Sequence, residues 1–156
     1  MSSHEKIEAF EKRLRALEDK DAIVSLLNRY CMLCDTHQWE EFGHCFLSDG
    51  VLGFEVWDEV VGPKKIAAIA AGAEDRFQGL QHSMTNMNVI INGDEATCTC
   101  YLWFAAIMDT SKPHEYHAFG GPYNFKFKRT TEGWRIARMQ LKKIWAQNKD
   151  TEGVFG

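Results

Sequence analysis

The chain has 156 residues, of which 45% are apolar and 26% are charged, a balance typical of one soluble globular domain. Its 18 basic and 22 acidic residues give a net charge of −4, and no basic stripe suits a nucleic-acid backbone. The longest apolar run, residues 66–71, is far shorter than the roughly 20 residues that a membrane-spanning helix needs. Nucleic acid and the membrane are therefore excluded as expected partners.

One domain is predicted over residues 1–147, followed by a flexible tail over residues 148–156, because the last segment is polar and contains glycine. The charged start of the sequence lacks the apolar region of a signal peptide. Five cysteines are an odd number, which suits reduced thiols better than a disulfide framework. We therefore expect a cytoplasmic protein.

The first half of the chain has the spacing of helices. Apolar residues recur at every third or fourth position over residues 5–18 and again over residues 21–35, which predicts two helices. Aromatic residues with similar spacing predict a short third helix over residues 39–46. A helix-initiating proline precedes the alanine-rich residues 66–77, which predict a fourth helix.

The second half of the chain has the alternating pattern of strands. A strand is predicted over residues 51–57, and two hairpins follow it. The first hairpin joins residues 83–91 to 97–108 across Asn-Gly-Asp, and the second joins residues 123–129 to 134–144 across Thr-Glu-Gly. Helices first and antiparallel strands later predict an α+β fold, in which a curved sheet wraps over the N-terminal helices.

Three polar residues lie within apolar patterns and are candidates for chemistry. Tyr30 lies on the apolar face of the second predicted helix, Asp35 lies at its end, and His82 lies at the entry to a strand. Each also has a structural explanation, as a core tyrosine, a helix-ending aspartate and a hydrogen-bonded histidine respectively. Spacing alone leaves both explanations open.

Cysteines and histidines form one pattern that is similar to a metal site. Cys31, Cys34, His37 and His44 can be written as Cx2C followed by Hx6H. Structural zinc sites usually place Hx3–5H on a separate element, and the two cysteines suit a buried helix face. The sequence also lacks a glycine-rich phosphate loop, a Ser-His-Asp elbow and a paired-carboxylate signature. We therefore predict no metal and no organic cofactor.

Four motifs, taken in order, resemble one family. They are a Tyr then an Asp near the end of the long helix, a His-x-x-x-Asn at the first long strand, a Gly-Asp-x-Ala hairpin, and a Tyr followed by Gly-Trp-Arg-Ile. In this order they resemble the SnoaL-like branch of the superfamily built on the nuclear-transport-factor-two fold, over about residues 21–141. The resemblance implies a cone-shaped α+β barrel of the cystatin-like type, whose mixed or antiparallel sheet curls around an apolar cavity.

Members of this branch include bile-acid 7α-dehydratase, scytalone dehydratase, hexachlorocyclohexane dehydrochlorinase and polyketide cyclases, which remove a proton without a metal or an organic cofactor. The resemblance implies that His82 is the general base, that Asp35 orients it and that Tyr30 hydrogen-bonds the substrate. A neutral imidazole with a pKa of about 6.5 can accept a proton at physiological pH, and a carboxylate behind it fixes the tautomer.

Residues on the later strands are candidates for the wall of the pocket. Tyr101 and Trp103 share one strand face, and Phe125 lies on a neighbouring predicted strand. Such aromatic residues suit a flat polycyclic or aromatic substrate, and they suit a packed core equally well. The resemblance offers Arg138 as a substrate-binding arginine on the last strand. Three further residues remain open as members of the site: Asp109, His114 and His117.

The expected protein is thus a cofactor-independent lyase or isomerase, similar to a dehydratase, that binds a small apolar molecule in an internal cavity. A polyketide or terpenoid cyclase with the same base is one alternative. A non-catalytic ligand-binding module, or the small subunit of a ring-hydroxylating dioxygenase, is another. Large apolar residues on the later strands, and the resemblance to trimeric dehydratases, predict a homo-oligomer, with a trimer favoured over a dimer.

Overall fold

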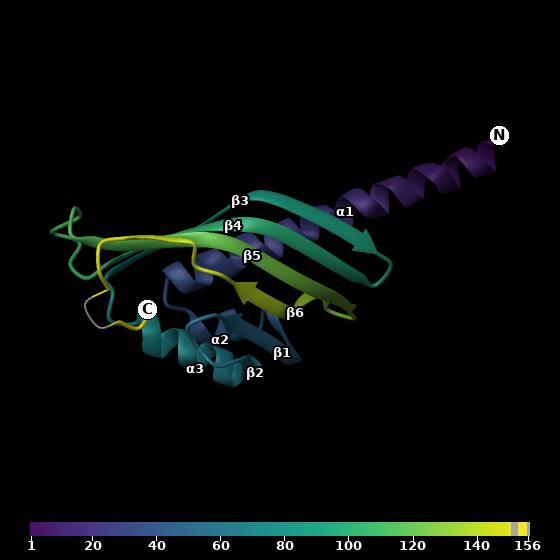
Figure 1. The fold of residues 1–156 in the computed structure, drawn as a ribbon. Helices are drawn as coiled ribbons and strands as arrows, with labels where there is room; N and C mark the ends of the chain where they lie inside the picture. Colours follow the sequence, from purple (N-terminus) through teal and green to yellow (C-terminus); the bar gives the residue numbers. More distant parts are fainter. Residues whose placement is uncertain (151–152, 156) are drawn as a thin grey trace.

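The computed structural model describes residues 1–150 and 153–155, and it shows a curved sheet with helices against its concave side (Figure 1). The helices are α1 (Ser3–Asp35), α2 (Trp39–Gly43) and α3 (Pro63–Glu74). The strands are β1 (Phe46–Phe54), β2 (Val60–Val61), β3 (Gly79–Asn92), β4 (Glu95–Ile107), β5 (Tyr116–Thr130), β6 (Gly133–Leu141) and β7 (Trp145–Gln147).

The sheet is mixed and does not close. Its strand order in the described chain is β2-β1-β6-β5-β4-β3, and β7 pairs with β5 beyond the end of β6. β1 and β6 run parallel, whereas the other neighbouring pairs are antiparallel. Because β2 and β3 stay at the edges, the sheet forms an open cone around the helices. The predicted α+β fold with helices under a curved sheet is confirmed.

Alternation along the strands places the core on the concave side. On β4, Cys98, Cys100, Leu102 and Phe104 are all buried, and the residues between them are exposed. The buried strand residues pack with the inward faces of α1 and α3 to form one hydrophobic core. The interior between helices and sheet is therefore where a cavity can form.

The two helices predicted over residues 5–18 and 21–35 are one continuous helix. Ser2 caps its start, and the Ser2 hydroxyl accepts a hydrogen bond from the backbone N–H of Glu5 at 3.2 Å. The polar stretch around residue 20 does not break the helix, because Asp19 binds Arg129 on β5 rather than ending a segment. Among the helices of the described residues, none combines the length and apolar character that crossing a bilayer requires.

Both predicted hairpins are confirmed, with β3 and β5 longer than predicted and β6 ending at Leu141 rather than at residue 144. Gly93 adopts φ 64° in the turn between β3 and β4, a conformation that glycine adopts without steric strain. The helix predicted over residues 39–46 ends earlier, at Gly43, and Phe46 already belongs to β1. Boundaries shifted because apolar residues at the end of α2 and the start of β1 suit either structure.

The C-terminal segment differs from the flexible tail expected from the sequence. Phe155 is 1% exposed and packs against the rings of Phe77, Phe104 and Phe119. Its carbonyl oxygen accepts a hydrogen bond from Lys143 Nζ at 2.8 Å. The polar composition of residues 148–156 does not indicate that Phe155 is buried. Residues 151–152 and 156 of the expected tail lie outside the described residues.

Candidate active site

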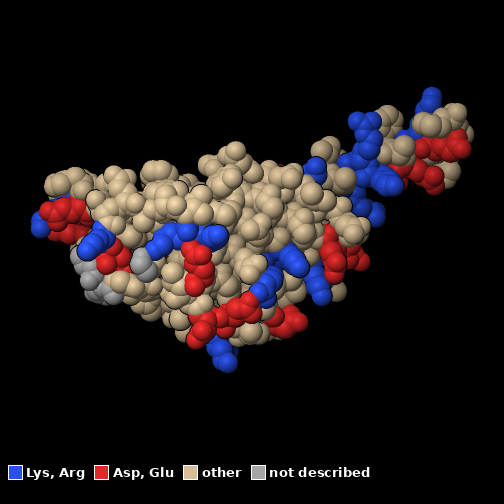
Figure 2. Space-filling model, in the orientation of Figure 1, with Lys and Arg blue, Asp and Glu red and all other residues tan. Residues whose placement is uncertain are grey.

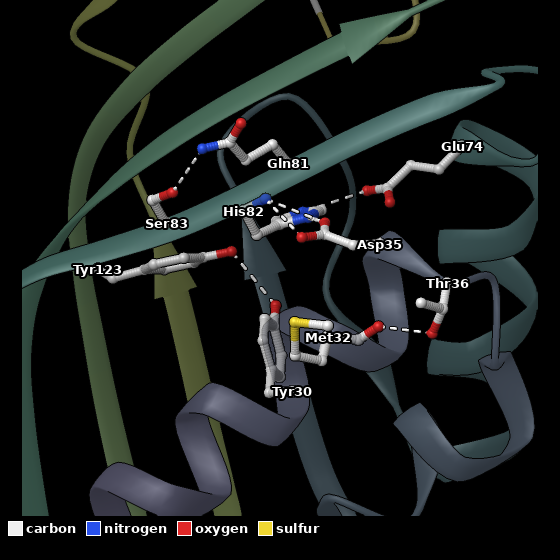
Figure 3. Close-up of polar contacts among 9 residues, drawn as sticks. All are labelled: Tyr30, Met32, Asp35, Thr36, Glu74, Gln81, His82, Ser83 and Tyr123. Carbon is white, nitrogen blue, oxygen red and sulfur yellow. Dashed lines mark hydrogen bonds and ion pairs between the residues drawn. The ribbon is translucent and has the colours of Figure 1, made fainter.

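His82 and Asp35 form a hydrogen-bonded pair on the concave side of the sheet (Figure 3). Asp35 is the last residue of α1, and His82 lies near the start of β3. Nδ1 of His82 lies 2.7 Å from Oδ1 of Asp35. The backbone N–H of His82 also donates to both carboxylate oxygens, at 2.9 and 3.1 Å. These contacts tie the end of the helix to the strand and fix the orientation of the imidazole.

The pairing leaves one imidazole nitrogen available for chemistry. Because a carboxylate accepts hydrogen bonds, Nδ1 carries the proton towards Asp35, and the neutral ring presents the lone pair of Nε2. Burial lowers the pKa of His82, but the Glu74 and Asp35 carboxylates outweigh burial, so the pKa lies above its ordinary value of 6.5.

Tyr30 lies in the same interior, earlier on α1. Its hydroxyl lies 3.2 Å from the hydroxyl of Tyr123 on β5, and both side chains are buried. Figure 3 shows the two hydroxyls meeting beside the His82–Asp35 pair. Burial raises the pKa of both phenols well above the ordinary value of 10.0. Both groups therefore stay protonated and can donate hydrogen bonds.

Glu74 completes the polar cluster, although no sequence motif marked it. It is the last residue of α3 and is 7% exposed. Its Oε1 lies 3.7 Å from Nε2 of His82, and its Oε2 has no hydrogen-bond partner within the described chain. Burial is the main cause that raises the pKa of Glu74. The charge of His82 lowers this pKa, and the Asp35 carboxylate raises it further. One signal was present: Glu74 follows Ile66 and Ala70 at steps of four, so it continues the buried face of α3.

A small cavity between the helices and the sheet is lined by Tyr30, Glu74, His82 and Tyr123, and Asp35 contacts it only through His82. Its volume is about 40 Å³, room for roughly one water molecule, and its wall is otherwise mainly aliphatic and aromatic. Four larger hollows, of about 390 to 460 Å³, open on the surface of the described residues, and none of them includes His82. Phe155 forms part of the cavity wall. The cavity is therefore too small for a ligand with a ring while Phe155 and the rest of the wall stay in place.

One cluster within the described residues offers three possible metal-ligand atoms within 4.8 Å of one another, from Cys34, Glu74 and His82. Burial raises the pKa of the Cys34 thiol well above its ordinary value of 9.0. Metals bind the thiolate rather than the thiol, so this thiol is a poor ligand. The arrangement fits neutral hydrogen-bonding groups better than it fits a metal.

The cysteine and histidine pattern found in the sequence is not assembled in space. Cys31 and Cys34 are buried in α1 as free thiols. His37 binds the carboxylate of Asp75, with Nδ1 and Oδ1 3.1 Å apart, and His44 lies on the surface. The four side chains therefore serve separate packing and surface contacts.

Tyr101 and Trp103, which the sequence offers as substrate-binding residues, do not line this cavity. They lie on the outer face of β4, with 51% and 48% of their surface exposed. Trp103 packs against Trp145, with ring centroids 4.7 Å apart. The inward positions are the alternate ones, Leu102 and Phe104. Both faces of β4 are apolar here, so alternation alone did not tell which face points inward.

Phe125 and Arg138 also lie apart from the cavity. Phe125 is buried on β5 and packs edge-on against Tyr30, with ring centroids 6.0 Å apart. Its effect on the site is therefore to hold Tyr30 in place. Arg138 forms an ion pair with Glu59 at the surface. Neither residue lines the cavity, and a binding role for them stays a prediction from the sequence.

The three residues left open by the sequence do not line the cavity either. Asp109 is partly exposed and His114 is exposed. His117 is buried, its Nδ1 lies 3.1 Å from the carbonyl oxygen of Asn148, and its ring stacks on Phe155. His117 therefore helps to seat the C-terminal segment.

Residues 15–140 match the family model described as the SnoaL-like domain. The chain belongs to the SnoaL-like domain family. The matched range contains the whole polar cluster of Tyr30, Asp35, Glu74 and His82. The resemblance inferred from the motifs is therefore confirmed. No match was found among curated protein sequences.

Solved structures similar to this SnoaL-like chain share its fold. An NTF2-like protein with a cystatin-like fold from Novosphingobium aromaticivorans is 22% identical, covers 94% of this chain and 95% of its own, and has a TM-score of 0.76. A protein of the same organism, named provisionally as a scytalone dehydratase, is 17% identical, covers 87% and 91%, and has a TM-score of 0.77. A protein of Streptomyces avermitilis, named provisionally as a dehydratase of the NTF2-like family, is 14% identical, covers 82% and 97%, and has a TM-score of 0.71.

Proposed function

We propose that the chain is a cofactor-independent lyase of the dehydratase kind, in which His82 removes a proton from a small apolar substrate. One observation carries the proposal. Nδ1 of His82 is held 2.7 Å from Asp35 Oδ1, while the His82 side chain lines a buried cavity. A general base needs a free lone pair, a fixed tautomer and a site from which bulk water is excluded, and this arrangement supports all three.

In the proposed reaction, Nε2 of His82 accepts a proton from a carbon next to a carbonyl group. Asp35 keeps the imidazole in the required tautomer and stabilises the imidazolium that forms. Tyr30 donates a hydrogen bond to the carbonyl oxygen, which gains negative charge as the C–H bond breaks. The raised pKa of Tyr30 supports this role, because a phenol that stays protonated remains a donor.

The proposed substrate is a small polycyclic or aromatic compound. The cavity wall includes the aromatic side chains of Phe54, Phe104 and Phe119, which suit a flat apolar molecule. Since the cavity holds only about 40 Å³, we propose that the substrate takes the place of the Phe155 ring. That ring belongs to the C-terminal segment, and its displacement leaves the sheet intact.

The proposal is tested with the exchange of the proton next to the carbonyl of a bicyclic ketone in D2O. We expect His82→Ala to lower the exchange rate by more than about 100-fold. We expect Asp35→Asn to lower it by a comparable factor, and the double variant to lose little more, because the two residues act as a unit. His114→Ala, at an exposed loop position, is the matched control and should leave the rate unchanged.

Two other outcomes would identify the alternatives. If the three variants change only the affinity for the ketone, the chain is a ligand-binding module rather than an enzyme. If His82 is also needed to close an open-chain diketone into a ring, by attack of the enolate on the second carbonyl, the base serves a cyclase. Full exchange in His82→Ala would contradict a role of His82 as the base, and lower melting temperatures without changed affinity would indicate a structural pair.

A further inference from the structure

Two buried carboxylates of the described chain have very different surroundings. Asp19 receives two hydrogen bonds from Arg129 and one from Trp134, and the Arg129 guanidinium lowers its pKa. Glu74 has a single ion-pair contact, to His82, and its Oε2 has no partner within the described residues. A buried carboxylate without a cation is strongly disfavoured. Glu74 therefore does not have the surroundings of a structural ion pair.

The groups around Glu74 favour its neutral form. Burial is the largest cause that raises its pKa, and the Asp35 and Asp75 carboxylates reinforce it, while His82 and His37 oppose it. Glu74 also ends α3, where the negative end of the helix dipole disfavours a carboxylate. The titratable groups that face it from its own and the neighbouring elements are Cys34 and Asp35 of α1, His37 after α1, Asp75 after α3, His82 of β3 and Tyr123 of β5.

We infer that Glu74 is a second catalytic residue, the acid that protonates the leaving group while His82 removes the proton from carbon. The inference rests on the proposed function and narrows the substrate to a β-hydroxy carbonyl compound, whose hydroxyl leaves as water. Glu74 and His82 line the same cavity, with Oε1 and Nε2 only 3.7 Å apart. Two groups this close act on one face of a bound ring, so the elimination is syn.

Protons and electrons balance in this step. Nε2 of His82 takes the proton, the C–H electron pair becomes the new C=C bond, and the C–O bond breaks with its electrons on oxygen. The carboxyl of Glu74 gives its proton to that oxygen, and water leaves. The imidazolium then returns its proton to the Glu74 carboxylate across the 3.7 Å gap, which restores both groups without an oxidant or a cofactor.

The test separates proton removal from elimination. The ketone 1-decalone, which lacks a leaving group, reports proton exchange in D2O, and 3-hydroxy-1-decalone reports elimination. We expect Glu74→Gln to lower elimination by about 100-fold or more and to keep exchange within about threefold of the wild type. His82→Ala should lower both reactions. Glu95→Gln, the same change at an exposed glutamate outside the cavity, should leave both within about threefold.

Equal losses in both reactions, or no loss in either, would overturn the role of Glu74. A second readout is the infrared difference spectrum between the wild type and Glu74→Gln at neutral pH. A protonated carboxyl band is expected, and a carboxylate band would overturn the inference. A purely structural Glu74 would lower the melting temperature when changed to Gln, whereas we expect no loss. If the wild type acts on neither ketone, the proposed function fails for this class, and the infrared band still decides whether Glu74 holds a proton.

Discussion

The two halves of α1 carry similar apolar patterns but have opposite surroundings. In the second half, Ile23, Leu27 and Tyr30 are buried under the sheet, and the helix ends at Asp35 of the candidate site. The first half projects beyond the sheet (Figure 1). Its apolar residues are 54–65% exposed, and they are Ile7, Phe10, Leu14 and Leu17.

This difference shows that helical periodicity reports an apolar stripe and does not report what covers it. In the second half the cover is the concave face of β3 and β6, together with α2. In the first half no described part of the same chain covers the stripe. Exposed apolar residues in a continuous stripe are typical of a protein interface. We therefore expect the two halves to respond differently to the same substitution.

The largest expected effect comes from removing the same side chain from each half. Leu27→Ala should lower the free energy of unfolding by about 2–5 kcal/mol, because it leaves a cavity in the core. Leu14→Ala should lower it by no more than about 0.5 kcal/mol in the monomer, because Leu14 is half exposed. Urea denaturation of both variants measures the comparison, and alanine favours helix at both positions.

Urea denaturation at several protein concentrations shows whether a second copy of the chain covers Leu14. If Leu14 is covered by a second copy of the chain, the effect of Leu14→Ala should grow with protein concentration, since association stabilises the folded state. The effect of Leu27→Ala should stay constant. Equal effects of the two substitutions at low concentration would show that the first half packs against the body of its own chain.

A smaller effect is expected at Asp19, where α1 meets the sheet. Asp19→Ala leaves Arg129 and Trp134 without their carboxylate partner, which lies 2.6 and 3.1 Å from their nearest nitrogens. We expect a loss of about 2–3 kcal/mol, below the roughly 3–5 kcal/mol of a fully buried pair, because Arg129 is one-third exposed. Thermal unfolding measures it, with the exposed neighbour Asp21→Ala as the control. A loss below about 0.5 kcal/mol would show that solvent replaces the network.

The exposed stripe leads to a prediction about self-association. Charged side chains gather at the projecting end of α1 (Figure 2), and four exposed apolar residues lie in the same segment. We propose a homo-oligomer, with a trimer favoured, in which this stripe is buried. Changing Phe10 and Leu14 to Glu should weaken association at least about tenfold, equivalent to about 1.4 kcal/mol. Analytical ultracentrifugation measures the change.

The control for this experiment lies on the opposite face of the same segment. Lys12→Glu adds negative charge about 180° around the helix from the stripe, at about 100° per residue. It should leave the association constant unchanged. If the wild type is a monomer at micromolar concentration, or if Lys12→Glu dissociates it equally, the stripe is not the interface.

Much of the fold could be predicted from local patterns, for physical reasons. Alternation and Asn-Gly-Asp identify the β3–β4 hairpin, because a tight turn and a two-residue period are local properties. The continuity of α1 was missed because the charged residues near Asp19 are typical of a helix break. Their actual partner, Arg129, is distant in the sequence. Long-range ion pairs leave no local signal.

The candidate site was predicted in part. His82, Asp35 and Tyr30 came from motifs in a fixed order, and the structure brings all three together. Glu74 was missed because a single glutamate at the end of an alanine-rich helix has the composition of a solvated helix end. Trp103 was assigned to the wrong face because an apolar outer surface has the same alternation as an inner one.

The smallest expected effect is the dependence of stability on pH, which the buried second half of α1 helps to set. The pKa of Asp19 is lowered by Arg129, so its contribution is present above its unfolded value of 3.8 and is lost as pH falls through the folded value. The pKa of His82 is raised, so its contribution is present below 6.5 and is lost as pH rises through the folded value. The pKa of Glu74 is also raised, so its contribution to the stability of the fold decreases as pH rises above 4.5. Stability should therefore be highest at about pH 4 to 4.5, and fall below this range through Asp19 and above it through Glu74 and then His82. Asp19→Asn should flatten the acid side of the profile and Glu74→Gln the alkaline side, because each removes one titrating group. Urea midpoints measured from pH 3 to 9 check this, and an unchanged alkaline side in Glu74→Gln would contradict a raised pKa at that residue.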